Sequence, residues 1–223
     1  MVKRKFKPAA VIFDMDGVLV DSMPYHFIAW YEALQPLGIR VSAFEVYERE
    51  GERWEKSLRD FITQGGLKPT PELIRKVFLR RRRIFRKYFK CTIFSGAEEC
   101  LRALKEKGLI LGIVTGTPMS QLKRILPRKI QSYFDTIVTG DLVKKGKPHP
   151  ESFLKAAKSL NLKPFQCLVI ENAPLGIKSA KAAGMYCLAI TTSLPKAYLK
   201  EANTVVNSLK DVVAVLGSFR KIN

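Results

Sequence analysis

Cysteine and histidine are scarce in this chain, which has four cysteines and two histidines among 223 residues. No two cysteines are spaced as C-x-x-C and neither histidine lies near a cysteine, which argues against a zinc site or a disulfide framework. Long apolar runs are also missing, since none approaches the roughly 20 residues of a membrane-spanning helix. We therefore expect isolated, partly buried thiols at Cys91, Cys100, Cys167 and Cys187.

The start of the chain does not have the pattern of a secretory signal. Residues 1–7 are basic, but the short apolar stretch behind them runs directly into Asp14 and Asp16, which a signal peptide would not do. We expect a cytoplasmic protein with no membrane partner.

Basic residues outnumber acidic ones, with 39 lysines and arginines against 20 aspartates and glutamates and a formal net charge of +19. Such a chain attracts anions, including nucleic acid and phosphorylated metabolites. The densest basic run, residues 80–83, has helical spacing and is interpreted first as a solvated helix face. No nucleic-acid-binding module is found, so nucleic acid is not expected as the main partner, although a non-enzymatic basic binding protein stays open.

The order of apolar runs predicts an α/β protein. Near-continuous apolar segments, typical of buried parallel strands, lie at 9–13, 110–115, 136–139, 167–171 and 186–190. Amphipathic helices are predicted between them at 96–107, 150–160 and 174–183.

Residues 22–90 break this alternation, because they contain helical patterns only. The four helices expected there are 24–37, 43–50, 54–64 and 71–89. We therefore predict a Rossmann-like open parallel sheet as the core, formed by residues 1–21 and 91–223, with a helical cap of residues 22–90 inserted after the first strand. In such sheets ligands bind at the carboxyl ends of the strands.

Two aspartates, Asp14 and Asp16, end the first apolar run, and Gly17 follows them. A simple turn would explain these residue types equally well. A calcium loop would not, because no further acidic ligands follow at the required spacing.

Four longer segments are more specific than the aspartate pair alone. They are FDMDGVLVDS at residues 13–22, VTGT at 114–117, GKPHP at 146–150 and VIENAPLG at 169–176. In this order, at predicted strand ends and helix starts, they resemble the four motifs of the haloacid dehalogenase-like hydrolases. The segment after the first motif is similar to the small helical cap of the phosphoglucomutase-like subfamily.

This resemblance implies phosphoryl transfer through a carboxylate. Asp14 would be the nucleophile that forms an aspartyl-phosphate, and Asp16 the general acid and base. We expect burial to raise the pKa of Asp16 above its usual value. Mg²⁺ would be the cofactor, held by the Asp14 carboxylate, the Asp16 carbonyl and the Asn172 side chain.

The second and third motifs would bind the phosphate and neutralise its charge. The resemblance implies that Thr115 and the backbone amides near Gly116 and Thr117 hold the phosphoryl oxygens. Lys147 would neutralise charge on Asp14 and on the phosphate. Taken without the family context, Lys147 could equally be a surface lysine in a basic loop.

The fourth motif departs from the family pattern, which often has an acidic pair where this chain has Glu171 and Asn172. A neutral ligand leaves the metal site less negative, so we expect somewhat weaker Mg²⁺ binding, with Glu171 acting through a coordinated water. Asn172 could instead cap the helix predicted from Pro174.

Two residues of the predicted cap, His26 and Arg53, would contact the substrate, and by resemblance Arg53 would contact a distal phosphate. His26 packed near Trp30 and Arg53 as a simple surface charge remain open as alternatives.

A phosphatase and a phosphosugar mutase of the β-phosphoglucomutase type share the first half-reaction. A mutase holds a second phosphate, which needs positive partners. Pro118 and Met119, which follow Thr117, offer none, although the run at residues 80–83 could if its face turned inward. We therefore expect a Mg²⁺-dependent phosphatase of a small phosphorylated metabolite such as a sugar phosphate, with the mutase as the alternative. The sequence does not indicate the oligomeric state.

Overall fold

The computed structural model describes residues 6–220 and contains a six-stranded sheet in the order β3-β2-β1-β4-β5-β6. Every neighbouring pair is parallel, and β1 lies near the middle between β2 and β4. The strands are β1 (Ala10–Phe13), β2 (Ile110–Val114), β3 (Thr136–Val138), β4 (Cys167–Glu171), β5 (Tyr186–Ile190) and β6 (Thr204–Val206).

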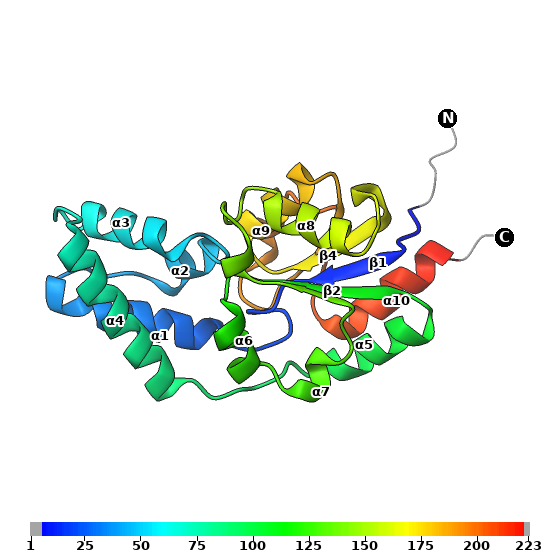
Figure 1. The fold of residues 1–223 in the computed structure, drawn as a ribbon, viewed down its shortest axis with the longest axis horizontal. Coiled ribbons are helices and arrows are strands. Elements are labelled where there is room, and N and C mark those ends of the chain that lie inside the picture. Colours follow the sequence, from blue (N-terminus) through cyan, green and yellow to red (C-terminus); the bar gives the residue numbers. More distant parts are fainter. Residues whose placement is uncertain (1–5, 221–223) are drawn as a thin grey trace.

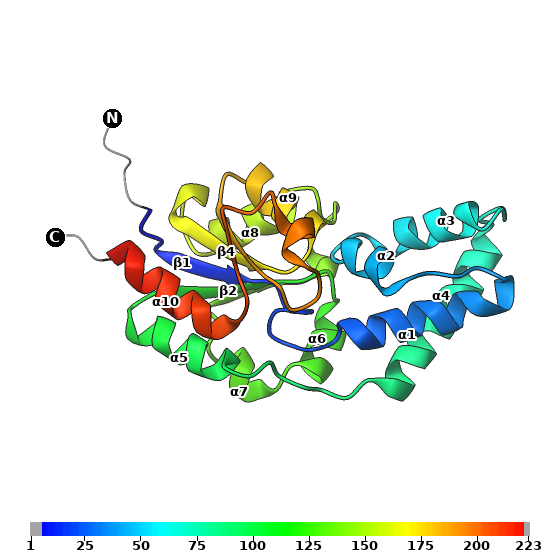
Figure 2. The same ribbon diagram turned by 180° about the vertical axis from the view of Figure 1, so that it is seen from behind.

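Helices cover both faces of this sheet (Figures 1 and 2). They are α5 (Ala97–Glu106), α6 (Met119–Ile125), α7 (Arg128–Gln131), α8 (Glu151–Ser159), α9 (Pro174–Ala182) and α10 (Leu209–Arg220). Short 3₁₀ turns lie at Gln35–Leu37, Gly140–Leu142, Pro164–Gln166 and Lys196–Leu199.

The central strand shows why its sequence is apolar throughout. Val11 and Phe13 pack into the core shared with α5 and α10, whereas Ala10 and Ile12 face the core shared with α8 and α9. Successive strand residues point to opposite faces, so a strand covered on both sides needs apolar residues at every position. The polar residues that follow Phe13 therefore mark the edge of the sheet.

Four of the five α-helices between β1 and β2 form a separate group beside the sheet, as Figure 1 shows. They are α1 (Met23–Leu34), α2 (Ala43–Glu48), α3 (Trp54–Gln64) and α4 (Pro71–Tyr88). Ser42 and Glu45 make a reciprocal capping box at the start of α2, and the Thr70 hydroxyl accepts a hydrogen bond from the Leu73 amide at the start of α4. Trp30 and Phe61 pack edge to face between α1 and α3.

The predicted α/β class with an open parallel sheet is confirmed, and the five predicted strands match β1 to β5 within about a residue. The sequence analysis missed β6, α6, α7 and α10, which are short or only weakly periodic. The helix predicted at 43–50 ends at Glu48, and the one predicted at 24–37 becomes a 3₁₀ turn from Gln35. The four cysteines are unpaired. Among residues 6–220, no helix is long and apolar enough to cross a membrane.

Candidate active site

The first motif leaves β1 in a tight turn that only glycine permits. The Asp14 amide still donates to the Ile170 carbonyl at 3.0 Å, and the Gly17 amide then closes the turn on the Val20 carbonyl at 2.8 Å. Gly17 has a φ of 81°, and a Cβ placed on it would lie 2.1 Å from the Asn172 Nδ2 atom. The turn therefore brings the first and fourth motifs into contact.

Lys147 joins the two motifs through a buried ammonium group. Its Nζ atom donates to Asp14 Oδ1 at 2.5 Å and to Glu171 Oε1 at 2.6 Å, and all three side chains are almost fully buried. The backbone of Gly51, in the loop after α2, covers the lysine stem, since a Cβ on Gly51 would lie 2.3 Å from Lys147 Cδ. Lys147 is therefore enclosed, and is not a surface lysine.

The nucleophile candidate lies in a region that has too little positive charge. Burial is the main cause that raises the pKa of Asp14 well above its ordinary value, and the charges of Glu171 and Glu50 raise it further. Lys147 opposes this, and the pKa of the lysine is itself raised because Asp14 and Glu171 outweigh its burial. A cation bound beside Asp14 would oppose this rise in its pKa.

Two orphaned oxygens show where such a cation fits. Asp14 Oδ2 and Asn172 Oδ1 are buried and make no hydrogen bond within the described part of the chain. The Asn172 amide nitrogen donates to Ser193 Oγ at 2.8 Å, which fixes the side chain with its oxygen as the free atom. Asn172 makes no capping bond to α9. Hard oxygen donors suit Mg²⁺, and these residues therefore fit the implied ion.

Both carboxylate oxygens of Glu171 already accept hydrogen bonds, so neither is free to bind a metal ion directly. Its second oxygen accepts from the amides of Asn172 at 2.9 Å and Ala173 at 3.3 Å, at the start of α9. The absence of a side chain at Gly176 leaves room for this carboxylate, because a Cβ there would lie 1.8 Å from Glu171 Oε1. Residues 6–220 contain no group of three or more histidine, cysteine, aspartate or glutamate side chains that could hold a metal.

Asp16 is surrounded by hydrogen-bond donors. Ser22 Oγ donates to Oδ1 at 2.6 Å and His26 Nε2 lies 3.3 Å from the same oxygen, whereas the hydroxyls of Thr115 and Thr117 donate to Oδ2 at 3.3 and 3.0 Å. Burial raises the pKa of Asp16, but the bonds from His26, Ser22 and Thr117 outweigh it, and the pKa lies below its ordinary value. The predicted rise in this pKa is therefore wrong for this arrangement.

Ser22, the last residue of the first motif, offers a direct test of this network. Ser22→Ala should cost about 1.5–3 kcal/mol of unfolding free energy at pH 7, because it removes a bond to a buried charge. Asp16 contributes stability above its unfolded pKa, roughly 3.9, and loses it as the pH falls through the lower folded pKa. In Ser22→Ala the folded pKa of Asp16 lies closer to its unfolded value. The difference in unfolding free energy between the wild type and the variant should therefore shrink below about pH 4.

Denaturant unfolding of metal-free protein at pH 7 and pH 3.5 measures this gap, and a carboxyl-carbon NMR titration of Asp16 should show a higher pKa in the variant. Ser95→Ala, at an exposed position, is the matched control. An unchanged Asp16 pKa would contradict the prediction.

The second motif forms a loop that faces Asp16. Thr115 and Thr117 follow β2, and the Thr117 amide donates to Thr115 Oγ1 at 3.0 Å. Gly140 supports the loop from behind, because a Cβ on it would lie 2.1 Å from the Gly116 carbonyl oxygen. The loop thus presents the Thr115 side chain that the sequence analysis assigned to the phosphoryl oxygens, together with the Thr117 hydroxyl, which it did not assign.

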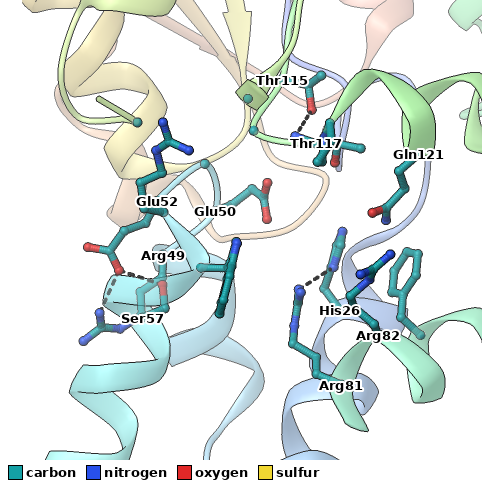
Figure 3. A pocket seen from close by; sticks show the side chains of 18 of the residues that line it. His26, Arg49, Glu50, Glu52, Ser57, Arg81, Arg82, Thr115, Thr117 and Gln121 are labelled. Atoms are coloured by element: carbon teal, nitrogen blue, oxygen red, sulfur yellow. Dashed lines mark hydrogen bonds and ion pairs between the residues drawn. The ribbon is translucent and has the colours of Figure 1, made fainter. Parts of the chain in front are cut away.

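A cavity of about 660 Å³ lies between the four helices α1–α4 and the carboxyl ends of the strands. Lys147, Thr115, Gly116 and Thr117 line it from the sheet side. His26, Glu50, Arg81 and other residues of the helical segment line it from the opposite side, as Figure 3 shows.

The two residues predicted to contact substrate from the cap occupy different places. His26 lies at the centre: its Nδ1 accepts from Arg81 Nη2 at 3.1 Å, so Nε2 carries the hydrogen that faces Asp16. The imidazole stacks on Phe85 and not on Trp30. Arg53 also lines the cavity, but its guanidinium donates hydrogen bonds to the carbonyls of Val143 and Lys144, in the loop that follows the 3₁₀ turn Gly140–Leu142.

Glu50 and Arg81 are among the lining residues that sequence reasoning did not single out. Arg81 was placed in the solvated run, yet it lies over the Trp30 ring at 4.3 Å. Its position could have been found from spacing, because it continues the apolar stripe of α4 formed by Ile74, Val77 and Ile84. Glu50 lies in a turn, where no periodicity indicates direction.

Known proteins match this chain over most of its length. Residues 8–184 match the family model of the haloacid dehalogenase-like hydrolases. A phosphorylated carbohydrates phosphatase of Thermotoga maritima is 34% identical over 79% of this chain and 82% of its own. The β-phosphoglucomutase of Bacillus subtilis is 30% identical over 93% of this chain and 92% of its own.

A solved structure, the β-phosphoglucomutase of Clostridium difficile, superposes with a TM-score of 0.82 at 26% identity, covering 96% of this chain and 98% of that one. The four sequence motifs, the parallel sheet with helices inserted after its first strand and the family match agree with one another. The chain therefore belongs to the haloacid dehalogenase-like hydrolases and, within them, to the phosphoglucomutase-like subfamily.

Proposed function

We propose that this protein is a Mg²⁺-dependent phosphatase of phosphorylated carbohydrates that works through an aspartyl-phosphate on Asp14. The observation that carries the proposal is the buried contact of Asp14 with Lys147, next to the Thr115–Thr117 loop and beneath a cavity large enough for a sugar phosphate. We also propose that residues 22–90 act as the cap and residues 1–21 and 91–223 as the catalytic core.

In the first half-reaction, an Asp14 oxygen attacks phosphorus and the bond to the leaving oxygen breaks. Thr115, Thr117 and nearby amides hold the phosphoryl oxygens, and Lys147 balances the charge that collects there. Asp16 gives a proton to the leaving alcohol. In the second half, Asp16 takes a proton from water, which attacks the acyl phosphate and frees Asp14.

The low pKa of Asp16 is compatible with this role, because two of the hydroxyls that bond to Asp16 are also the ones proposed to bind the phosphoryl group. Thr115 and Thr117 donate to Asp16 in the structure. When their hydroxyls turn to the phosphoryl group, Asp16 loses two donors and gains a neighbouring dianion. Both changes raise its pKa toward the value that a general acid needs.

Asp14 Oδ2, Asn172 Oδ1 and the Asp16 carbonyl are the oxygens proposed to hold Mg²⁺. When bound, the ion would supply positive charge that reduces the repulsion between the Asp14 carboxylate and the phosphate. The neutral Asn172 makes this ligand set less negative than an acidic pair would, and supports the expectation of weaker metal binding.

A phosphosugar mutase is the second candidate, and one observation favours it. Arg82 and Arg86 of α4 and Arg124 of α6 line the cavity, and none of them forms an ion pair with a carboxylate among the described side chains of residues 6–217. These guanidinium groups could hold the second phosphate that Pro118 and Met119 cannot.

The test separates the two reactions. Purified protein is assayed with Mg²⁺ on a panel of sugar phosphates, polyol phosphates, nucleotides and p-nitrophenyl phosphate, and separately on β-glucose 1-phosphate with a trace of the 1,6-bisphosphate. We expect release of inorganic phosphate that EDTA abolishes and Mg²⁺ restores. Rapid isomerisation with little free phosphate would favour the mutase, and salt-dependent nucleic-acid binding without any turnover would contradict both.

A further inference from the structure

The Glu50 carboxylate lies in the wall of the catalytic cavity. It follows α2 in the turn that ends at Gly51, and Figure 3 shows its side chain pointing into the space between the Thr115–Thr117 loop and His26. The Glu50 side chain makes no hydrogen bond or ion pair with the described atoms of residues 6–217. Burial raises the pKa of Glu50, and Asp16, His26 and Lys147 are close enough to influence it. Glu50 is half-buried, so its carboxylate is accessible from the cavity and free to accept a hydrogen bond from a ligand.

Arg81, which lines the cavity from the same helical side as Glu50, offers a donor that the protein leaves unused. Its Nη2 atom is occupied by His26, but its Nε–H is buried and has no hydrogen-bond partner among the described residues. Burial lowers the pKa of Arg81 to about 10, while the charges of Glu50 and Asp16 oppose the shift. Glu50 and Arg81 therefore attract each other, yet no ion pair joins them in the described part of the chain. The space between them is left for another molecule.

We propose that Glu50 and Arg81 form a hydroxyl-binding subsite. This subsite would bind a hydroxyl group of the substrate's leaving alcohol. A hydroxyl both donates and accepts, so a single one can donate to the Glu50 carboxylate and accept from the Arg81 guanidinium, whose Nη1 atom makes no hydrogen bond among the described residues. Neighbouring hydroxyls of a polyol suit a carboxylate with two free oxygens. The subsite lies beside Asp16, where the leaving alcohol must be.

This assignment narrows the substrate class, and it rests on the proposed phosphatase function. Glu50 favours neutral polyhydroxylated phosphate monoesters and disfavours phosphorylated acids, whose carboxylate would meet a like charge beside Asp16. The exposed arginines that line the cavity, Arg82, Arg86 and Arg124, do not change this expectation, because the proposed subsite acts on the part of the leaving group beside Asp16.

A three-carbon series tests the subsite. The substrates are glycerol 3-phosphate, n-propyl phosphate, which lacks hydroxyls, and 3-phosphoglycerate, which carries a carboxylate. The wild-type protein should have a kcat/KM for glycerol 3-phosphate roughly 10- to 100-fold above each of the others, because sites built to bind a hydroxyl reject analogues without it. In Glu50→Gln, which keeps the size and removes the charge, both ratios should fall about 10-fold.

Glu48→Gln is the matched control, since Glu48 carries the same charge at the end of α2 but does not line the cavity; its ratios should equal those of the wild type. If the wild type hydrolyses p-nitrophenyl phosphate but shows no preference within the series, or if Glu50→Gln leaves the preference intact, the subsite is wrong and the phosphatase stands. If the wild type hydrolyses no phosphate monoester at all, both proposals fall.

Discussion

Asp14→Asn is expected to lower kcat by about 10⁴-fold or more, because a neutral amide cannot attack phosphorus and no neighbouring group can replace it. Glu171 is held by Lys147 and two amides, and Asp16 by four donors, so neither carboxylate is free to act as nucleophile. The measurement is steady-state phosphate release, together with acid-quenched trapping of label from a ³²P-labelled substrate. The wild type should retain label on the protein and the variant should retain none.

The same substitution should leave the fold intact. Since burial raises the pKa of Asp14, its ionised form is costly in the folded state, and a neutral side chain of the same shape removes that cost. The thermal midpoint of Asp14→Asn should therefore equal or exceed that of the wild type. Asp21→Asn, in the same motif but outside the cavity, is the control and should keep its activity. Trapped label or near-normal turnover in Asp14→Asn would show that Asp14 is not the nucleophile.

The fold could be predicted from the sequence because its strongest signals are local. A strand buried on both faces, such as β1 or β4, must be apolar at every position, and the amphipathic helices between the strands set the parallel order. β6 and α10 could not be found in this way. β6 is three half-buried residues at the edge of the sheet, and it is recognisable only once β5 provides a partner.

The candidate site was predictable to the extent that it depends on strand ends. Asp14 and Glu171 follow or end neighbouring strands, so topology alone places them together. The direction of the Asp16 pKa shift was not predictable, because it depends on how many donors converge from the start of α1 and from the loop after β2. Glu50 and Arg81 were hidden for similar reasons, because Glu50 lies in a turn and Arg81 belongs to a run of arginines whose composition indicates a solvated face.

Lys147→Met should have the second largest effect, on stability as well as on rate. Removing the ammonium leaves the Asp14 and Glu171 carboxylates buried without a cation, which costs about 3–5 kcal/mol at neutral pH. Catalysis should fall by roughly 10²- to 10³-fold, since Lys147 balances the charge on the transferred phosphoryl group. Lys145→Met, on an exposed neighbour in the same loop, is the control and should change neither property.

The pH dependence distinguishes a buried charge from lost packing. In the variant the folded pKa of Asp14 rises further above its unfolded value of roughly 3.9, so stability is complete below that pH and is lost as the pH rises through the folded pKa. The deficit of Lys147→Met should thus be small near pH 4 and large at pH 8 in denaturant unfolding of metal-free protein. Lost van der Waals contacts would lower stability equally at both pH values. A deficit independent of pH would mean that the lysine acts through its aliphatic stem, and that Asp14 is not the charge it balances.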